Sequence, residues 1–423
     1  MANTLSLEKI ADLFSTIAPK TDNRTKVSPF LFVVYLVLDL SKDNSKRSIA
    51  GMCRSLKQDT GITISRSSFW ERLSRKRLNT LLNALIDGLM LQVFGNILVT
   101  KTMLQQLGVI KVYLFDSTTI TLTDSAINHF KGVNGKAGIK LHACINLFSG
   151  SIEWFKLTES KCHDRICFPE VNLFTGTLVI FDLGYFDYQL MTALIDVGAF
   201  FLCRLKDNSV VYITEVMSGL PSKAIGQSLL KACKQNKHDA DMIEVKIQKL
   251  INGKILDCRA IGFWNSTDKH YHWYLTNLVV PAKLIYVLYR LRWQIELAFK
   301  SCKSILNLDE IGSANPMIVE NFILATIAAN LASQSIRDVV STELSEKQNL
   351  AITFQRIAMM LCRLYQHFII YILNPVQENL DNLVCEISLT KSDLYDPNYR
   401  KRETGKMRLY RVLNEIEGSM AVV

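Results

Sequence analysis

Apolar and polar residues follow the period of an α-helix through residues 1–105, so this part of the chain is predicted to be helical. Its longest apolar run, residues 29–38, is about half of the ~20 residues that a bilayer-spanning helix needs. We therefore expect a buried helix there. Residues 48–77 predict a helix, a short turn at residues 60–62 and a second helix, for which Ser65 is a suitable N-cap.

From residue 111 the pattern changes to short strands separated by helices. The strand at 111–115 ends on Asp116, and the wholly apolar strand at 178–181 ends on Asp182. The other predicted elements are a hairpin of 139–148 and 152–157, a helix near 164–174, a helix near 186–197 and a strand at 200–205. This order indicates an α/β sheet with mixed strand directions.

Residues 207–278 predict an antiparallel β insertion into this α/β domain. Strands near 243–247 and 255–263 flank the hairpin signal Asn252-Gly253, and a third strand is expected at 272–276. A helix is then expected at 281–306, apolar helices from 317 to about 373, and a basic helical tail at 400–411. The expected segments are a helical N-terminal region at 1–105, core parts at 106–206 and 279–345, the insertion at 207–278 and a helical C-terminal region at 346–423.

Composition favours a large folded core and a polyanionic partner. Apolar residues make up 49% and charged residues 21% of the 423 positions, and the formal net charge is +10. A positive balance favours nucleic acid, because neutralised phosphates release condensed counterions. The ten cysteines include no CxxC pair, and the group Cys162, His163 and Cys167 lacks a nearby fourth zinc ligand. Residues 1–20 do not resemble a signal peptide. We therefore expect reduced thiols, no membrane partner and a cytoplasmic protein.

A basic cluster lies on and after the second helix of the predicted helix–turn–helix. It consists of Arg66, Arg72, Arg75, Lys76 and Arg77. One interpretation is that these side chains contact DNA, as helix–turn–helix modules do. The alternative is an ordinary helical hairpin with a solvated basic face.

Three carboxylates form the candidate catalytic set: Asp116, Asp182 and Glu296. The two aspartates close apolar strands, and strand ends are where α/β sheets place their sites. Residues 281–306 are expected to form a helix, and one face of that helix carries Tyr289, Arg292, Glu296, Lys300 and Lys303. Hard carboxylate oxygens suit Mg²⁺ or Mn²⁺, and a pair of such ions catalyses phosphoryl transfer. The bland alternative is a solvated face with an Arg292–Glu296 pair.

These motifs resemble those of the DDE transposases of bacterial insertion sequences, in the branch with a Tyr-x2-Arg-x3-Glu-x6-Lys signature. Tyr289, Arg292, Glu296 and Lys303 complete that signature. The resemblance also covers the segments 115–118, 138–142, 163–164, 180–186, 201–206 and 275–278, and so spans roughly residues 110–310.

The resemblance implies a ribonuclease-H-like catalytic core with a β insertion between Asp182 and Glu296. It also implies Mg²⁺ or Mn²⁺ as the cofactor, two ions per site, and a protein that cleaves the ends of its element and joins their 3′-OH groups to target DNA. The DNA partners are then the terminal inverted repeats and the target. A synaptic homodimer is implied as well, and the helices after residue 317 with the tail are our candidate for its contact.

Several further residues have two interpretations. Trp293 is expected to be a core anchor, with base stacking as the alternative. Tyr289 and Lys300 are expected to contact DNA, although Lys300 is equally suited to a solvated surface. His163 and Asp164 are candidates for supporting the metal site from around its ligands. The basic tail at 400–411 is either a DNA contact or a solvated helix.

Three other functions compete with transposition. A structure-specific nuclease would use the same ions and carboxylates without strand transfer. A repurposed relative would bind DNA without catalysis, although all three carboxylates are present. A helix–turn–helix regulator would leave the carboxylates unexplained.

Overall fold

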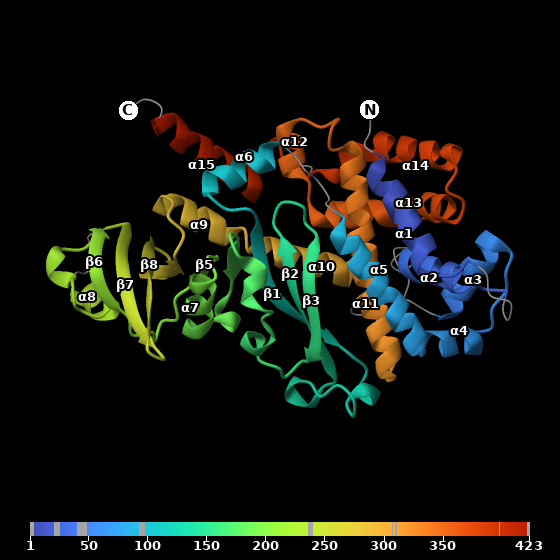
Figure 1. The fold of residues 1–423 in the computed structure, drawn as a ribbon, viewed down its shortest axis with the longest axis horizontal. Coiled ribbons are helices and arrows are strands. Elements are labelled where there is room, and N and C mark those ends of the chain that lie inside the picture. The colour runs from blue at the N-terminus through green and yellow to red at the C-terminus, as the bar shows by residue number, and fades with distance from the viewer. Residues whose placement is uncertain are drawn as a thin grey trace. The chain divides into compact units, whose positions relative to one another are not determined.

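The computed structural model describes residues 4–20, 26–39, 49–92, 98–235, 240–306, 308, 311–396 and 398–420. Two compact units account for the chain, and each joins stretches that are distant in sequence (Figure 1). The first unit comprises residues 1–99, 117–162 and 296–407, and the second comprises 100–116, 163–295 and 408–423. The division into five consecutive segments stays a prediction.

The first unit is mainly helical. Its helices are α1 (Leu5–Ile17), α2 (Pro29–Leu38), α3 (Ile49–Thr60), α4 (Arg66–Leu73), α5 (Lys76–Leu91), most of α10 (Trp293–Ser304), α11 (Pro316–Val340), α12 (Glu346–Ala351), α13 (Phe354–Leu373) and α14 (Gln377–Thr390). The expected buried helix is confirmed, because every residue of α2 after Pro29 is buried. The side chain of Ser28 caps α2 by accepting a hydrogen bond from the backbone N–H of Leu31.

Helix α11 forms the centre of this unit. It begins after Asn315, whose side chain accepts hydrogen bonds from the N–H groups of Met317 and Ile318. The helix packs against α5, α13 and α2, and nearly all of its residues are buried. The apolar surface of α11 is thus mostly covered within its own unit, and the dimer contact expected of the helices after residue 317 with the tail stays a prediction.

Both α11 and α13 are long and apolar enough to cross a membrane by length and composition. In α11, 83% of the most apolar window is buried inside the protein, and in α13 the share is 56%. Core helices of globular proteins have this character. We interpret both helices as parts of the core of the first unit.

The first unit also contains the predicted β-hairpin. Strands β2 (Gly138–Asn146) and β3 (Ile152–Glu159) pair antiparallel on either side of residues 149–151, which confirms that prediction. The buried His142 of β2 forms a 2.9 Å hydrogen bond with the Thr158 hydroxyl of β3. This contact satisfies a ring nitrogen that would otherwise be buried without a partner.

The second unit is built on strands. They are β1 (Val112–Thr121, whose end from Ser117 belongs to the first unit), β4 (Leu178–Phe181), β5 (Phe200–Arg204), β6 (Tyr212–Ser218), β7 (Met242–Ile251), β8 (Lys254–Asn265) and β9 (His270–Thr276). Its helices are α6 (Leu98–Leu107), α7 (Tyr188–Asp196), α8 (Leu229–Gln235), α9 (Ala282–Arg290) and most of α15 (Gly405–Met420). The expected helix near 164–174 is wrong: Pro169 separates two short 3-10 turns, Asp164–Cys167 and Val171–Phe174.

The strands form a sheet of mixed direction, in the order β3-β2-β1-β4-β5-β9-β8-β7-β6. β1, β4 and β5 are parallel neighbours, and β9 pairs antiparallel with β5. All four residues of β4 are buried, as expected of a strand covered on both faces. The predicted α/β sheet with mixed directions is confirmed.

The predicted antiparallel β structure between residues 207 and 278 is also confirmed. β7 and β8 join through Asn252 and Gly253, which have φ angles of 48° and 82°. These left-handed conformations are typical of a two-residue hairpin turn. β6 completes this part of the sheet, and α8 follows it in the chain; neither element was predicted. Because β9 returns to pair with β5, the insertion extends the central sheet and does not form a separate one.

Arg259 of β8 anchors this insertion to the segment that leads into α9. Its Nε atom donates to Glu244 Oε1 at 2.8 Å, and its Nη1 atom donates to the carbonyls of Leu278 and Val280 at 2.7 and 2.8 Å. The side chains of Arg259 and Glu244 are only 11% and 12% exposed. The guanidinium therefore fixes the path of the chain from β9 to α9.

Candidate active site

Two candidate aspartates lie next to one another on parallel strands. The register pairs Phe115 of β1 with Phe181 of β4, and the next residues are Asp116 and Asp182. Neighbouring strands lie about 4.8 Å apart, so the two carboxylates leave the sheet from adjacent positions. Asp182 follows the end of β4 as predicted. Asp116 does not end its strand, because β1 continues to Thr121; the polar residues 116–119 were mistaken for its end.

A third carboxylate joins these two. The Gly184 N–H donates to Asp182 Oδ1 at 2.8 Å. A methyl group placed on Gly184 would lie 2.7 Å from Asp164 Oδ2 and 3.0 Å from Asp182 Oδ1, so both carboxylates approach this glycine. Burial raises the pKa of Tyr185, and the charges of Asp164, Asp116 and Asp182 raise it further. Three carboxylates therefore lie near enough to one buried tyrosine for their charges to act on it.

Asp164 is the residue that sequence reasoning underrated. It was expected only to support the metal site together with His163, which is exposed. The 3-10 turn Asp164–Cys167 brings the Asp164 carboxylate beside Gly184. The sequence pointed to Asp164 only because residues 163–164 belong to the segments that resemble the transposase family. Spacing along the chain does not show that Asp164 and Asp182 both approach Gly184.

Aromatic rings hold the floor of this site. The ring of Phe115 stacks on Phe168 with a centroid distance of 4.5 Å and meets Tyr185 edge to face at 5.8 Å. Phe174 packs edge to face against Phe115 at 5.6 Å. Such packing restricts the side chains beneath the carboxylates. Aromatic packing thus holds Phe115, the residue before Asp116, in the core.

Arg292 of the signature pairs with the first aspartate. Its Nη1 atom lies 2.8 Å from Asp116 Oδ2, and the two side chains are only 17% and 14% exposed. Tyr289 packs against Tyr274 at 4.9 Å, and burial raises the pKa of Tyr289 while the charge of Arg292 opposes that rise. Arg292 therefore belongs to the site that contains Asp116, and Tyr289 lies near enough to Arg292 for that charge to act on its hydroxyl.

The expected single helix at 281–306 is wrong. α9 ends at Arg290 and α10 begins at Trp293, with a tight turn of i→i−3 hydrogen bonds between them. One helical wheel cannot describe all five signature-region residues, because Tyr289 and Arg292 precede α10. Within α10, the residues Glu296, Lys300 and Lys303 still share a face by their spacing.

The α10 residues have different environments. Glu296 is half-buried, Lys300 is exposed, and Lys303 Nζ donates to the Thr119 carbonyl at 2.6 Å within the first unit. Trp293 is 57% exposed, so the expectation of a core tryptophan is wrong. The flat indole is accessible at the first position of α10, where it can meet a ligand.

The predicted helix–turn–helix elements are present in the first unit. α3 and α4 are joined by a turn in which Gly61 has a φ of 70°, and the Ser65 hydroxyl accepts from the Ser68 N–H to cap α4. Arg66, Lys76 and Arg77 are exposed. This confirms the two helices and the N-cap, while DNA binding by them stays a prediction.

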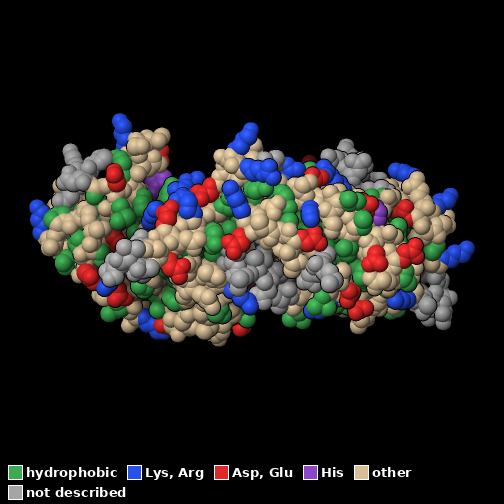
Figure 2. All heavy atoms as spheres, turned by 90° about the horizontal axis from the view of Figure 1, so that it is seen from above, with side chains coloured by type: hydrophobic (Ala, Val, Ile, Leu, Met, Phe, Trp, Pro, Cys, Tyr) green, Lys and Arg blue, Asp and Glu red, His purple; other side chains and the backbone are tan. Residues whose placement is uncertain are grey.

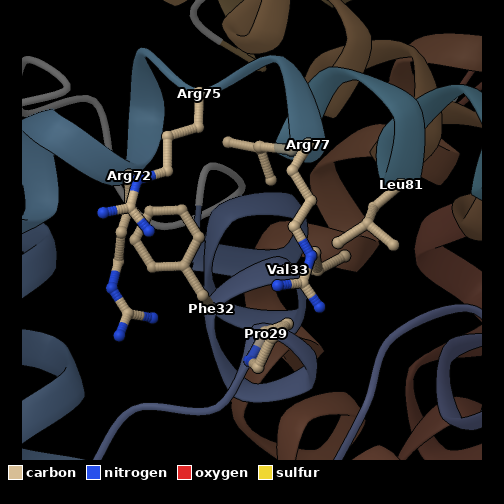
Figure 3. Close-up of a pocket in the computed structure, with 8 residues that line it drawn as sticks. Pro29, Phe32, Val33, Arg72, Arg75, Arg77 and Leu81 are labelled. Atoms are coloured by element: carbon tan, nitrogen blue, oxygen red, sulfur yellow. The ribbon is translucent and has the colours of Figure 1, made fainter. Parts of the chain in front are cut away.

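Three arginines of this region flank a surface pocket beside α2 (Figure 3). Arg72 is partly used inside the protein, since its Nη1 donates to the Val27 carbonyl at 2.7 Å and its guanidinium lies over the Phe32 ring. Arg75 forms an exposed ion pair with Glu71, and Arg77 extends along the opposite wall. The pocket thus combines an apolar floor with positive charge.

The basic tail differs from its prediction. α15 begins at Gly405, so Arg400, Lys401 and Arg402 precede the helix. Lys406 is buried over the Phe354 ring and does not face solvent. On the face shown in Figure 2, Lys and Arg side chains lie scattered with Asp and Glu between them. On this face the positive charges are therefore spread out and do not form one basic patch.

The donor set of the site fits a hard divalent cation. Asp116, Asp182 and Asp164 offer carboxylate oxygens only, which suits Mg²⁺ and Mn²⁺ better than softer metals. The buried aromatic floor lowers the local dielectric and increases the attraction between these oxygens and a cation. Glu296 belongs to the first unit and is half-buried there, and its place in this donor set stays a prediction.

Comparisons with known proteins point to one family. Residues 108–331 match the family described as Transposase DDE domain. The chain is 22% identical over 320 residues to the transposase for insertion sequence element IS231F from Bacillus thuringiensis subsp. israelensis, covering 66% of this chain and 67% of the relative. It is 24% identical to the transposase for IS231B from Bacillus thuringiensis subsp. berliner, covering 64% and 65%. The alignments thus span about two thirds of these relatives.

A solved structure, the piggyBac transposase synaptic complex with hairpin DNA, is similar with a TM-score of 0.46 and 12% identity over 94% of this chain and 89% of that one.

Proposed function

The chain belongs to the Transposase DDE domain family, and we propose that it is a DNA transposase that binds insertion-sequence ends, cleaves them and joins their 3′-OH groups to target DNA. The observation that carries this proposal is the placement of Asp116 and Asp182 at adjacent positions on parallel strands, with the signature residue Arg292 paired to Asp116. The protein acts in the bacterial cytoplasm, at the nucleoid.

The catalytic residues are Asp116, Asp182 and Glu296, which hold two Mg²⁺ or Mn²⁺ ions in each site. When bound, the ions supply Lewis-acid stabilisation of the attacking and leaving oxygens. Asp164 helps to bind or orient these ions, because its carboxylate lies beside that of Asp182. Tyr185 stays protonated, since its raised pKa opposes ionisation next to the carboxylates.

The catalytic core is ribonuclease-H-like, with the β insertion between Asp182 and Glu296. Support comes from the mixed sheet, in which the strands that bear the two aspartates are parallel neighbours and the antiparallel β2–β3 hairpin lies beyond β1. The insertion separates the second aspartate from the glutamate in sequence while Arg259 fixes where the chain re-enters α9.

Residues of the signature region contact the DNA. Arg292 and Lys303 bind phosphates, and Tyr289 and Lys300 add further contacts near the cleaved strand. The exposed Trp293 stacks on an unpaired base, a role that its accessibility supports. The Arg292–Asp116 pair holds the guanidinium beside the carboxylates that would hold the ions, where it would contact a phosphate of the DNA.

The N-terminal helices recognise the terminal inverted repeats. Exposed basic side chains on α4 and the start of α5 support this role; they are Arg66, Arg75, Lys76 and Arg77, with Arg72 at the pocket between them. Replacing the exposed Arg66, Lys76 and Arg77 with alanine should remove the preference for element ends over random DNA, whereas deleting residues 1–105 would also strip α2 and α5 from α11. If the triple variant keeps that preference at moderate salt, recognition lies elsewhere.

Two molecules assemble with two ends in a synaptic homodimer. The C-terminal region 346–423 supplies the contact, for which the exposed apolar side chains Ile370, Val376 and Leu389 are candidates. Light scattering with end DNA should give a two-protein, two-DNA complex. Replacing Ile370 and Leu389 with glutamate should leave one protein on one end; an unchanged complex would move the contact elsewhere.

The test of this function is a strand-transfer assay with DNA from the flanks of the coding region, a target plasmid and Mg²⁺. The wild-type protein should cut at the element ends and join them to the plasmid. Glu296→Gln should abolish both steps while end binding persists, because the residue is proposed to hold ions and not to read sequence.

Glu378→Gln is the matched control, since Glu378 is exposed in the first turn of α14. Cutting without joining would favour the structure-specific nuclease. End binding without cutting by the wild-type protein would favour the repurposed DNA-binding relative. Cutting that survives in Glu296→Gln would contradict the assignment of the glutamate.

A further inference from the structure

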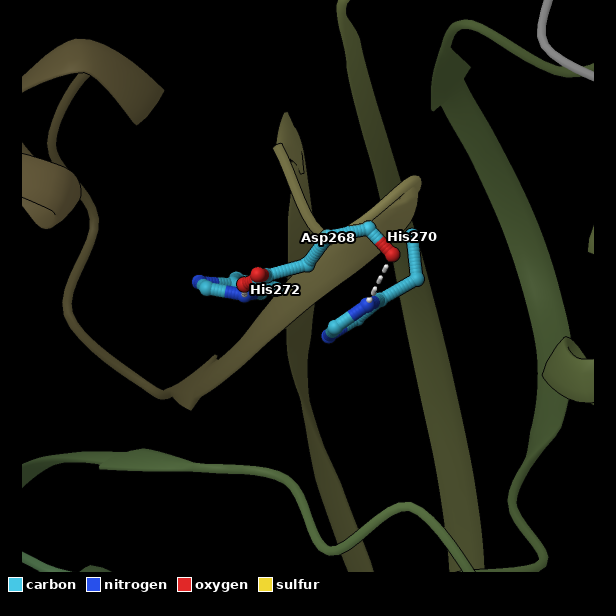
Figure 4. A group of neighbouring side chains, drawn as sticks. All are labelled: Asp268, His270 and His272. Carbon is cyan, nitrogen blue, oxygen red and sulfur yellow. Dashed lines mark hydrogen bonds and ion pairs between the residues drawn. The ribbon is translucent and has the colours of Figure 1, made fainter. Parts of the chain in front are cut away.

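The tip of the β8–β9 hairpin gathers three potential metal ligands. Asp268 lies in the turn after β8, and His270 and His272 lie at the start of β9. Their ligand atoms, one from each side chain, all lie within 4.8 Å of one another. Figure 4 shows the three side chains on one side of the hairpin tip. This group is separate from the carboxylates of the candidate active site in residue type and in sequence.

Local backbone geometry produces this group. Residues two apart on a strand point to the same face, so His270 and His272 are neighbours, with ring centroids 4.8 Å apart. Lys269 reverses the chain in a left-handed conformation with a φ of 53°. The Asn265 Oδ1 atom accepts from the Thr267 N–H at 3.0 Å, which closes the turn.

Hydrogen bonds orient the donors toward one another. Asn265 Nδ2 donates to Asp268 Oδ2 at 2.7 Å, which fixes that carboxylate. His272 Nε2 lies 3.1 Å from the same oxygen, and His270 Nδ1 lies 3.1 Å from the Asp268 backbone carbonyl. The carboxylate side chain is 47% exposed and the His272 side chain 25% exposed. The group thus faces solvent, and packing in the core does not account for it.

We propose that Asp268, His270 and His272 bind one divalent transition-metal ion of the zinc class. Two imidazole nitrogens and one carboxylate oxygen are ligands that Zn²⁺ accepts, whereas Mg²⁺ disfavours nitrogen. Metal–ligand bonds of about 2.0–2.2 Å require the three ligand atoms to lie closer together than the 4.8 Å within which they lie now. Rotation of these side chains about their bonds brings the atoms closer. Water completes the coordination.

The bound ion ties the turn to β9 and stiffens the end of the insertion. Asn265 is a positioning residue, because it donates a hydrogen bond to the Asp268 carboxylate and so holds this ligand beside His272. This site does not depend on the proposed function, since it uses none of the residues assigned to DNA cleavage.

The test is calorimetric titration of the full-length protein with Zn²⁺, in saturating Mg²⁺ so that the hard carboxylate site is occupied. The wild-type protein should bind about one ion per chain at this site. His270→Asn and His272→Asn should each weaken binding by roughly tenfold or more, and Asp268→Asn should weaken it as well. Cu²⁺ used as a spectroscopic probe should show nitrogen ligation that is lost in His270→Asn.

His129→Asn is the matched control, because His129 is exposed and lies outside the group. A thermal melt without metal should show all variants folded, since the substituted side chains are on a turn and strand end. Zn²⁺ affinity that is equal in the wild type and in both histidine variants would overturn the proposal. So would a Cu²⁺ spectrum without nitrogen ligands.

Discussion

Replacing Arg292 with alanine removes the guanidinium that lies 2.8 Å from Asp116 Oδ2. The two side chains are 17% and 14% exposed, so the energy of this ion pair should fall between those of two known classes. Exposed ion pairs contribute about 0.2–1 kcal/mol, and breaking a buried pair costs about 3–5 kcal/mol. A hydrogen bond to a charged group contributes about 1.5–3 kcal/mol. Because about 1.4 kcal/mol equals a tenfold change, a cation that competes with Arg292 for Asp116 should bind Arg292→Ala roughly ten- to a hundredfold more tightly.

The assay measures free Mn²⁺ by electron paramagnetic resonance while protein without DNA is titrated. Arg290→Ala is the matched control, because Arg290 is exposed and lies over the Tyr286 ring. The control should bind Mn²⁺ as the wild type does. Arg292→Ala should bind the ion more tightly and yet cleave end DNA more slowly, since its phosphate contact is lost. Mn²⁺ affinity that is unchanged or weaker in Arg292→Ala would refute this competition.

Three more substitutions test other parts of the structure. Arg259→Ala should lower the free energy of unfolding in urea by up to about 3–5 kcal/mol, because it leaves a glutamate that is only 12% exposed and two carbonyls without their donor. Lys254→Ala, which breaks an exposed ion pair, should cost less than about 1 kcal/mol, and equal losses would show that the contacts of Arg259 add nothing. Gly184→Ala should slow metal-dependent cleavage with little change in melting temperature, since the new methyl group would displace Asp164, and full activity would contradict the close approach. Burial lowers the pKa of Lys406 well below its usual 10.5, so at pH values between the two pKa values only the unfolded chain keeps this proton, and the stability of the fold rises with pH. Lys406→Met should raise the melting temperature at neutral pH and flatten this rise with pH. A lower melting temperature of the variant would show that the protein stabilises the Lys406 ammonium in place.

Regular elements with strong local signals were predictable from the sequence. The β7–β8 hairpin rests on alternating apolar residues and an Asn-Gly turn, and β4 on four apolar residues in a row. Errors arose where tertiary contacts override local pattern. β1 runs past Asp116 through polar residues. Only its first residues, 112–115, pair with β4, and β1 lies between β4 and β2 in the sheet.

The break between α9 and α10 could not be read from the residues. Residues 289–303 contain no Pro or Gly, so the helical period continues in sequence through Leu291 while the backbone tightens into a turn. The exposure of Trp293 follows from that break, since it moves the indole to the start of a new helix. The approach of Asp164 to Asp182 likewise depends on two loops that meet only in the folded chain.

Buried polar groups were a second limit of sequence reasoning. The basic residues at 400–411 suggested a solvated or DNA-binding helix, yet Lys406 is enclosed beside Phe354. Arg337 is also buried and donates to the Phe148 carbonyl at 2.5 Å. A charge in the sequence does not reveal whether its long side chain reaches water or a buried acceptor.

The proposed function requires that Asp116, Asp182 and Glu296 together hold the catalytic ions. The most direct measurement replaces Mg²⁺ with Fe²⁺, adds peroxide and ascorbate, and maps where the radicals formed at the ion cut the backbone. Cuts are expected near residues 116, 182 and 296, and excess Mg²⁺ should suppress them and Asp182→Asn remove them. Cuts near 116 and 182 without any near 296, or cuts that Mg²⁺ does not suppress, would contradict the assignment of these three ligands.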